Sequence, residues 1–235
     1  MSDDDIDVTP DAPEVGEQPE EEKKKKRRVL PLLLAIVLIC GGLGGIGYGV
    51  YAFWPKSAPT GIVDMEGNIV VPDDPDATSS AFLEAADMVT DIGGEGFIIA
   101  SVGLNVPLGS VNDVYGVMDP PNFTSAFLIR NRGVGLDNAS QGTVYIIAHS
   151  TRFGTAPGNL LQSNEHSLVK EGDMIQVNGL NYRVTGWQTS PQDQLGNVQE
   201  LWANTPGMLV FITCVLRNDR EAPTDNLIIT GQLVS

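Results

Sequence analysis

The chain has 235 residues and a formal net charge of −16, from 30 acidic and 14 basic residues. Six of the basic residues form one run, Lys23 to Arg28, so residues 56–235 hold only 8 basic residues against 20 acidic ones. A surface with this excess of negative charge repels phosphate backbones, which bind proteins through clustered lysine and arginine. Composition and charge therefore argue against nucleic acid as a partner.

The first 54 residues predict a tail and a membrane anchor. Residues 1–22 hold ten acidic residues, three prolines and no aromatic residue, which is typical of disorder, so we expect 1–28 to be an acidic, disordered tail ending in the basic run. Residues 29–54 carry no charge and exceed the roughly 20 helical residues that span a bilayer. A cleaved signal peptide has a shorter apolar core. Because basic residues stay on the cytoplasmic side, we expect a single-pass cell-membrane protein with a cytoplasmic N-terminus and an extracellular C-terminal domain.

Residues 55–84 predict an extracellular linker, since their first part is rich in proline, aspartate and glycine. Phe82, Ala86 and Val89 fall at i, i+4 and i+7 after Ser79, a possible N-cap. This spacing predicts a short amphipathic helix at the entry to a domain that spans 85–235.

From Gly96 onward, short apolar or alternating runs are separated by glycine, asparagine, aspartate and proline. Many short strands with turn signals between them indicate an all-β barrel or sandwich. No segment in 96–235 has the pattern of a long helix. The expected strands are FIIAS (97–101), AFLIR (126–130), TVYIIA (143–148), MIQV (174–177), YRVTGW (182–187), MLVFIT (208–213) and NLIITGQLV (226–234).

Two residues at predicted strand ends could carry nucleophilic chemistry. His149 follows TVYIIA and Cys214 follows MLVFIT. The only other cysteine, Cys40, lies in the predicted membrane span, which makes an internal disulfide implausible. A thiolate attacks carbonyl carbon, and a nearby imidazole both stabilises the thiolate and delivers a proton to the leaving amine. The alternative is a structural cysteine with an unrelated surface histidine, and spacing alone leaves the two interpretations about even.

A third group would have to stabilise the oxyanion, and a guanidinium can do so. Arg217 and Arg220 follow Cys214 closely, although either could be an ordinary surface arginine.

Zinc sites need three or four clustered ligands, which the domain lacks, and no calcium-binding loop or phosphate-binding glycine loop is recognisable. We therefore expect no metal and no cofactor.

Six segments follow one another in the domain: FIIASVGLNVPL (97–108), VYIIAHS (144–150), RFGTAPGNLLQS (152–163), LVKEGDMIQV (168–177), LVFITC (209–214) and DNLIITGQLV (225–234). Taken in this order, they resemble the sortase family over roughly residues 95–235. The details around the cysteine look closest to the class E and F branches of actinobacteria, which are Gram-positive.

The resemblance implies an all-β, eight-stranded barrel with short helices, preceded by the transmembrane helix. It also implies a cysteine transpeptidase. Cys214 would cleave a C-terminal sorting motif of an exported protein through a thioester, and His149 would act as acid and base. An amine acceptor on peptidoglycan or a pilin would release the product, although water could replace it and give a hydrolase.

The chain departs from the family at the arginine, which in many sortases opens the last strand. Asp225 or Asn226 holds that place here. The resemblance carries the oxyanion role to Arg220, with Arg217 as a competitor and Asn226 as a different kind of donor. A catalytically degenerate, sortase-like extracellular binding module is the alternative function.

Overall fold

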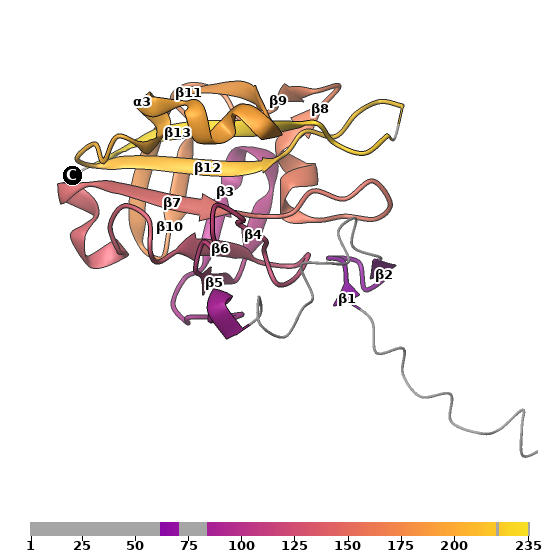
Figure 1. Ribbon diagram of the computed structural model, residues 1–235, viewed down its shortest axis with the longest axis horizontal. Helices are drawn as coiled ribbons and strands as arrows, with labels where there is room; N and C mark the ends of the chain where they lie inside the picture. The colour runs from indigo at the N-terminus through magenta and orange to yellow at the C-terminus, as the bar shows by residue number, and fades with distance from the viewer. Residues whose placement is uncertain (1–61, 71–83, 220, 235) are drawn as a thin grey trace, which may run out of the picture. The chain divides into compact units, whose positions relative to one another are not determined.

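The computed structural model describes residues 62–70, 84–219 and 221–234 (Figure 1). The predicted tail (1–28) and the predicted membrane span (29–54) lie outside these residues and stay predictions. Within the described ranges, no helix is both long enough and apolar enough to cross a membrane.

One nine-stranded sheet forms the body of the described chain. Seven of its strands coincide with the runs predicted from the sequence, because these runs combine branched apolar side chains with turn residues at both ends. Along the sheet, the strands are β4 (Leu104–Val106), β3 (Phe97–Ile99), β10 (Met174–Val177), β11 (Leu180–Pro191), β13 (Asp225–Leu233), β12 (Met208–Cys214), β7 (Thr143–Ile147), β6 (Ala126–Ile129) and β5 (Leu108–Val111).

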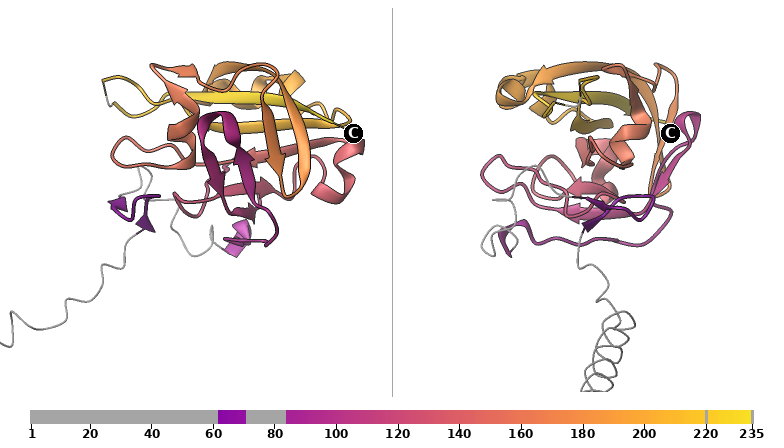
Figure 2. Two further views of the ribbon diagram at one scale, coloured as in Figure 1. Left: turned by 180° about the vertical axis from the view of Figure 1, so that it is seen from behind. Right: turned by 90° about the vertical axis from the view of Figure 1, so that its right-hand side faces the viewer.

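The sheet curls until its two edges nearly meet. Its edge strands, β4 and β5, are consecutive in the chain and are separated only by Pro107. The edges therefore come together at this corner, and the sheet is a nearly closed barrel, as the two views in Figure 2 show. The predicted number of eight strands was wrong by one. Proline has no N–H for a strand ladder, and Pro107 divides one extended run into two strands that lie at opposite edges.

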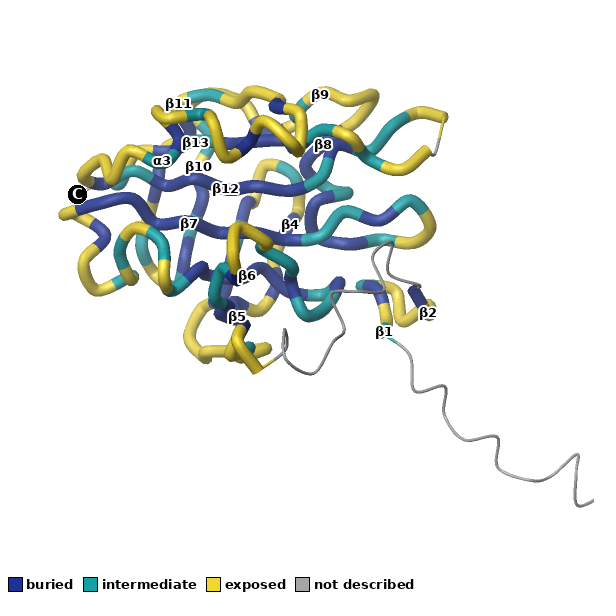
Figure 3. Tube along the Cα trace, in the orientation of Figure 1, coloured by how far each residue is buried: buried dark blue, intermediate teal, exposed yellow. Residues whose placement is uncertain are grey.

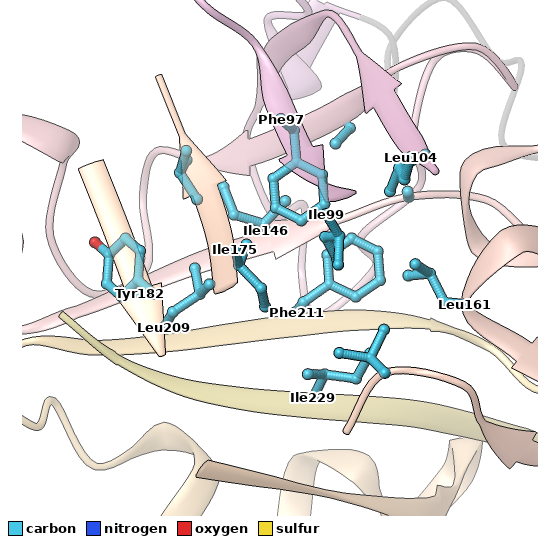
Figure 4. Close-up of a cluster of buried hydrophobic side chains, with 14 of the residues drawn as sticks. Phe97, Ile99, Leu104, Ile146, Leu161, Ile175, Tyr182, Leu209, Phe211 and Ile229 are labelled. Carbon is cyan, nitrogen blue, oxygen red and sulfur yellow. The ribbon is translucent and has the colours of Figure 1, made fainter. Parts of the chain in front are cut away.

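The strands in the middle of the sheet are buried on both faces. On β7 and β12, Val144 and Phe211 belong to the main cluster of buried side chains, whereas Tyr145 and Val210 belong to a second cluster on the opposite face. Part of the main cluster is drawn in Figure 4, where Phe97 stacks on Phe211 with ring centroids 5.2 Å apart. Burial on both faces explains why these segments are continuous apolar runs rather than alternating ones.

Short helices cover the sheet or connect its strands. They are η2 (Ala100–Val102), η3 (Leu136–Gln141), η4 (Pro157–Leu161), η5 (Gln192–Asn197) and α3 (Gln199–Trp202), and a further small hairpin pairs β8 (Gln162–Ser163) with β9 (His166–Ser167). The helix predicted after Ser79 is described only at residues 84–86, which are helical. Val89 instead forms an isolated bridge with Ser110.

Part of the predicted linker forms a hairpin between β1 (Ile62–Val63) and β2 (Ile69–Val70). Its turn is organised by the buried carboxylate of Asp64, which accepts hydrogen bonds from the N–H groups of Glu66, Asn68 and Thr155. Burial raises the pKa of Asp64, but these hydrogen bonds outweigh it and the pKa lies below its ordinary value. The carboxylate thus fastens the hairpin to the loop that contains Thr155.

Tyr182 offers a test of the core. Its side chain is fully buried, and its hydroxyl finds no hydrogen-bond partner in the described part of the chain, while burial raises its pKa to about 12. Because an unsatisfied buried hydroxyl costs about 1–3 kcal/mol, we expect Tyr182→Phe to raise the free energy of unfolding by about 1 kcal/mol in urea titrations at pH 8.

The same substitution should change the alkaline limb of stability. The folded-state pKa lies above the unfolded value of 10, so wild-type stability falls as the pH rises from 10 towards 12. The Tyr182→Phe variant should lose less stability between pH 10 and 12, because it has no phenol hydroxyl at this position to ionise. If the variant is instead less stable than the wild type at pH 8, the hydroxyl has a partner and this account of the core is wrong.

Candidate active site

His149 and Cys214 lie at the same level on neighbouring strands. β7 and β12 run parallel and side by side (Figure 1). Their register puts Ile147 opposite Ile212. The ladder continues through a hydrogen bond from the Ala148 N–H to the Ile212 carbonyl. His149 lies two residues beyond the end of β7 and Cys214 is the last residue of β12. Continuing the register of the pair therefore puts them at matching positions, on segments about 4.8 Å apart.

Strand alternation also puts both side chains on one face. Ile147 and Ile212 belong to the second cluster, opposite the main core, and residues two positions further on share their face. Figure 3 shows β7 and most of β12 buried, and the exposure is intermediate at Cys214 and at His149, just beyond β7. The His149 side chain is 19% exposed, so an approaching substrate can reach the pair from solvent.

The imidazole of His149 is held on two sides. Its ring stacks on Phe123, with centroids 4.1 Å apart and an interplanar angle of 14°. Its Nε2 lies 2.8 Å from the Pro120 carbonyl and 3.6 Å from Oδ1 of Asp119. Because a carbonyl only accepts, Nε2 carries a proton and donates it. Nδ1 is then the nitrogen that can exchange a proton with a thiol, and Asp119 is placed to stabilise the imidazolium that results.

Phe123 links this histidine to the β1–β2 hairpin. It packs in a small cluster with Val70, Ala156 and Ile62, and it lies beside Asp64 through an isolated bridge. The hairpin therefore supports the aromatic ring on which the imidazole rests. The sequence predicted a linker where this hairpin lies, and Phe123 was not among the predicted site residues.

Cys214 is flanked by two carboxamides on the side away from His149. The Nε2 of Gln192 lies 3.6 Å from Sγ and donates to it. Asn226 on β13 is the residue directly opposite Cys214 in the antiparallel ladder. The site therefore has an imidazole on one side of the thiol and amide groups on the other.

A tight polar contact joins the two strand ends beneath this pair. The Ser150 and Thr213 hydroxyls are 2.8 Å apart, and the Gly158 N–H donates to the His149 carbonyl. A Cβ added at Gly158 would come within 2.2 Å of both hydroxyl oxygens. Only glycine allows η4 to approach the strand ends this closely, so the η4 backbone fixes the path of the chain at His149.

Gln162 also holds the chain in place next to His149 and Cys214. Its Oε1 accepts a hydrogen bond from the Leu216 N–H at 2.8 Å, and its Nε2 donates to the carbonyl oxygen of Cys214 at 2.9 Å. The same Nε2 lies 3.1 Å from the Ser150 hydroxyl and from the Gly158 carbonyl. One buried amide thus connects the chain next to His149, at Ser150 and Gly158, with the chain at and after Cys214.

The arginines predicted from the sequence are not brought to the thiol in the described part of the chain. Arg220 lies outside the described residues, so its role stays a prediction. Arg217 binds Asp219 through two hydrogen bonds, at 3.1 and 2.7 Å. These bonds raise the pKa of Arg217 and lower that of Asp219 to about 2. The place opposite Cys214 belongs to Asn226, which the sequence analysis named as an alternative donor.

Gln162, Gln192 and Asp119 were missed by sequence reasoning. Each acts through a contact between segments far apart in the chain, such as the 52 positions between Gln162 and Cys214, and no local spacing marks them.

Among the described residues, no group of three or more His, Cys, Asp and Glu side chains is arranged to hold a metal ion.

No protein-family model matches this chain, and no curated protein matches it. Among solved structures, it is similar to sortase A from Corynebacterium diphtheriae (TM-score 0.45, 16% identity, covering 74% of this chain and 75% of that one). It is also similar to sortase C-1 from Actinomyces oris (TM-score 0.44, 16% identity, 80% and 95%) and to Listeria monocytogenes sortase A (TM-score 0.44, 18% identity, 60% and 86%). At these scores the similarity carries no argument about activity, which has to come from the site.

Proposed function

We propose that this chain is a sortase-type cysteine transpeptidase that works outside the cell membrane. The observation that supports the proposal is the register of the parallel strands β7 and β12, in which Ile147 lies opposite Ile212. His149 and Cys214 each follow these residues by two positions, so we infer that they meet on one face where the strands end. The substrate class, a sorting-signal peptide of exported proteins, comes from the sequence resemblance of residues 95–235. The class E and F subtype likewise rests on the sequence alone.

In the proposed reaction, the Cys214 thiolate attacks the carbonyl carbon of the scissile peptide bond. The tetrahedral intermediate then expels the amine, which takes its proton from Nδ1 of the His149 imidazolium, and a thioester remains on Cys214. An amine acceptor on peptidoglycan or a pilin attacks the thioester and gives a proton to His149. The new amide leaves and the Cys214 thiolate and His149 imidazolium are restored, while attack by water would give hydrolysis.

The location outside the membrane depends on residues 1–54. The uncharged segment 29–54 and the basic run before it support a single-pass anchor with a cytoplasmic N-terminus. The domain would then meet substrates as they leave the membrane. Protease treatment of intact cells tests this topology, since only the C-terminal domain should be digested.

A second candidate is a degenerate, non-catalytic binding module. The observation in its favour is Asn226, because the position opposite the cysteine holds an uncharged amide rather than an arginine. Such a module would bind its partner equally well after Cys214→Ala, whereas an enzyme would lose turnover.

Intact-mass analysis separates the two candidates. The full-length protein in detergent is incubated with a pool of LPxTG-type peptides, and adducts are mapped by fragmentation so that Cys40 is distinguished from Cys214. The transpeptidase predicts a peptide-derived acyl adduct on Cys214 that hydroxylamine removes and that Cys214→Ala abolishes. The absence of any adduct, together with a Cys214 that resists iodoacetamide near neutral pH, would support the binding module.

A further inference from the structure

The proposed reaction places a negative charge on a carbonyl oxygen close to Cys214. Hydrogen-bond donors already aimed at this oxygen stabilise the transition state more than the substrate. The described arginine nearest in sequence, Arg217, has its guanidinium engaged by Asp219. Among the described residues, two amide side chains lie close to the Cys214 thiol, those of Gln192 and Asn226.

Asn226 meets the positional requirement. It faces Cys214 directly across the β12–β13 ladder, and directly opposite residues have Cβ atoms about 4.5–5.5 Å apart. Its neighbour two positions on, Ile228, lies in the same cluster as Ile212, so the Asn226 and Cys214 side chains share a face. Asn226 is only 8% exposed, and its side chain makes no hydrogen bond within the described residues, which leaves its N–H groups available to a substrate.

Gln192 approaches the thiol from the next strand. It follows the end of β11, and its backbone N–H donates to the Thr224 carbonyl at 2.9 Å, which fixes the corner against the start of β13. Its Nε2 lies 3.6 Å from the Cys214 Sγ. A donor at this distance from the nucleophile can also reach an oxygen on the carbon that the sulfur attacks.

The four groups follow the order of the strands. His149, two residues beyond β7, comes first, then Cys214 on β12, Asn226 on β13, and Gln192, which directly follows β11. The acid–base group and the two amides thus lie on opposite sides of the nucleophile. Building on the proposed function, we propose that Gln192 and Asn226 form an oxyanion pocket of two neutral amides.

If the oxyanion is bound by two neutral amides, the loss of either one should lower kcat. Hydrogen bonds from a charged donor are roughly twice as strong as those between neutral groups, so each amide should matter and neither should be sufficient alone. Removing one oxyanion donor typically lowers kcat by about 10²–10³-fold. Because the lost bond forms only in the transition state, KM should change little.

The test compares two reactions of the same thiol in the full-length protein. Thioester formation with an acylating peptide passes through an oxyanion, whereas alkylation of Cys214 by iodoacetamide does not. We expect Gln192→Ala and Asn226→Ala each to lower the acylation rate about 10²-fold with KM nearly unchanged. Alkylation should fall by no more than about threefold in either variant, and normal alkylation would also show that the strand ends stay folded.

Gln194→Ala is the matched control, because Gln194 is exposed in the same short helix and bonds to Asn197. It should keep both rates. Acylation at the wild-type rate in Gln192→Ala and Asn226→Ala would overturn the amide pocket while leaving the proposed function intact. Equal losses of acylation and alkylation would also overturn it, because they indicate a damaged nucleophile. A wild-type protein that is never acylated would overturn the proposed function and the pocket together.

Discussion

Replacing His149 with alanine is expected to slow thioester formation on Cys214 by about 10²–10⁴-fold, the usual contribution of a positioned acid–base group. Without the imidazole, the thiol loses its proton acceptor and the leaving amine loses its proton donor. Unlike the amide variants, His149→Ala should also slow alkylation by iodoacetamide, because the thiolate loses the group that stabilises it. Timed intact-mass measurements of both reactions give the two rates.

The other histidine supplies the control. His166 is exposed in β9 and meets Trp187 edge-on, with ring centroids 5.9 Å apart. His166→Ala should keep wild-type rates in both reactions. Because the His149 ring stacks on Phe123, circular dichroism should accompany the measurement. A folded His149→Ala protein that is acylated at the wild-type rate would remove the basis of the proposed dyad.

The sequence predicted the strands well because their local signals are strong. TVYIIA and MLVFIT, for example, became β7 and β12 within one residue at their ends. The closure of the barrel was less accessible, because it depends on how Pro107 sends two halves of one extended run to opposite sheet edges. That outcome is fixed by pairing with distant strands, which no short window of sequence contains.

In the candidate site, too, local sequence predicted some features, whereas others depend on contacts between distant segments. His149 and Cys214 could be proposed from the sequence because each follows an apolar run and carries reactive chemistry. Their matching level could not, since it depends on the register of a parallel pair whose partners are 65 positions apart. Gln192 and Gln162 were harder still, because a glutamine has no distinctive local pattern and becomes informative only once its neighbours are known.

The second large effect is expected at Gln162, where one buried side chain satisfies groups from several segments. Gln162→Leu keeps roughly the same volume but removes the acceptor of the Leu216 N–H and the donor to the Cys214 carbonyl. Each buried polar group left without a partner costs about 1–3 kcal/mol. We therefore expect urea titrations to show a loss of about 3 kcal/mol in the free energy of unfolding, accompanied by slower acylation of Cys214.

Gln162→Glu separates the hydrogen bonds of this side chain from its packing, because it changes charge rather than shape. One carboxylate oxygen would still accept from the Leu216 N–H, but the other would face the oxygens of Cys214, Ser150 and Gly158, which now accept from Nε2. Burial and these acceptors disfavour the ionised form, so the pKa of the introduced glutamate should rise above its unfolded value of about 4.3. The protonated side chain can donate and restore part of the network.

The sign of the pH dependence follows from that shift. A carboxyl group with a raised folded-state pKa leaves the protein most stable below the unfolded pKa, and stability is lost as the pH rises above it. Relative to the wild type, Gln162→Glu should therefore be close in stability at pH 4 and clearly weaker at pH 7. The exposed Gln194→Glu should show no such difference. Equal destabilisation of Gln162→Glu at both pH values would mean that Gln162 matters for packing alone, and that its hydrogen bonds do not hold the ends of β7 and β12 together.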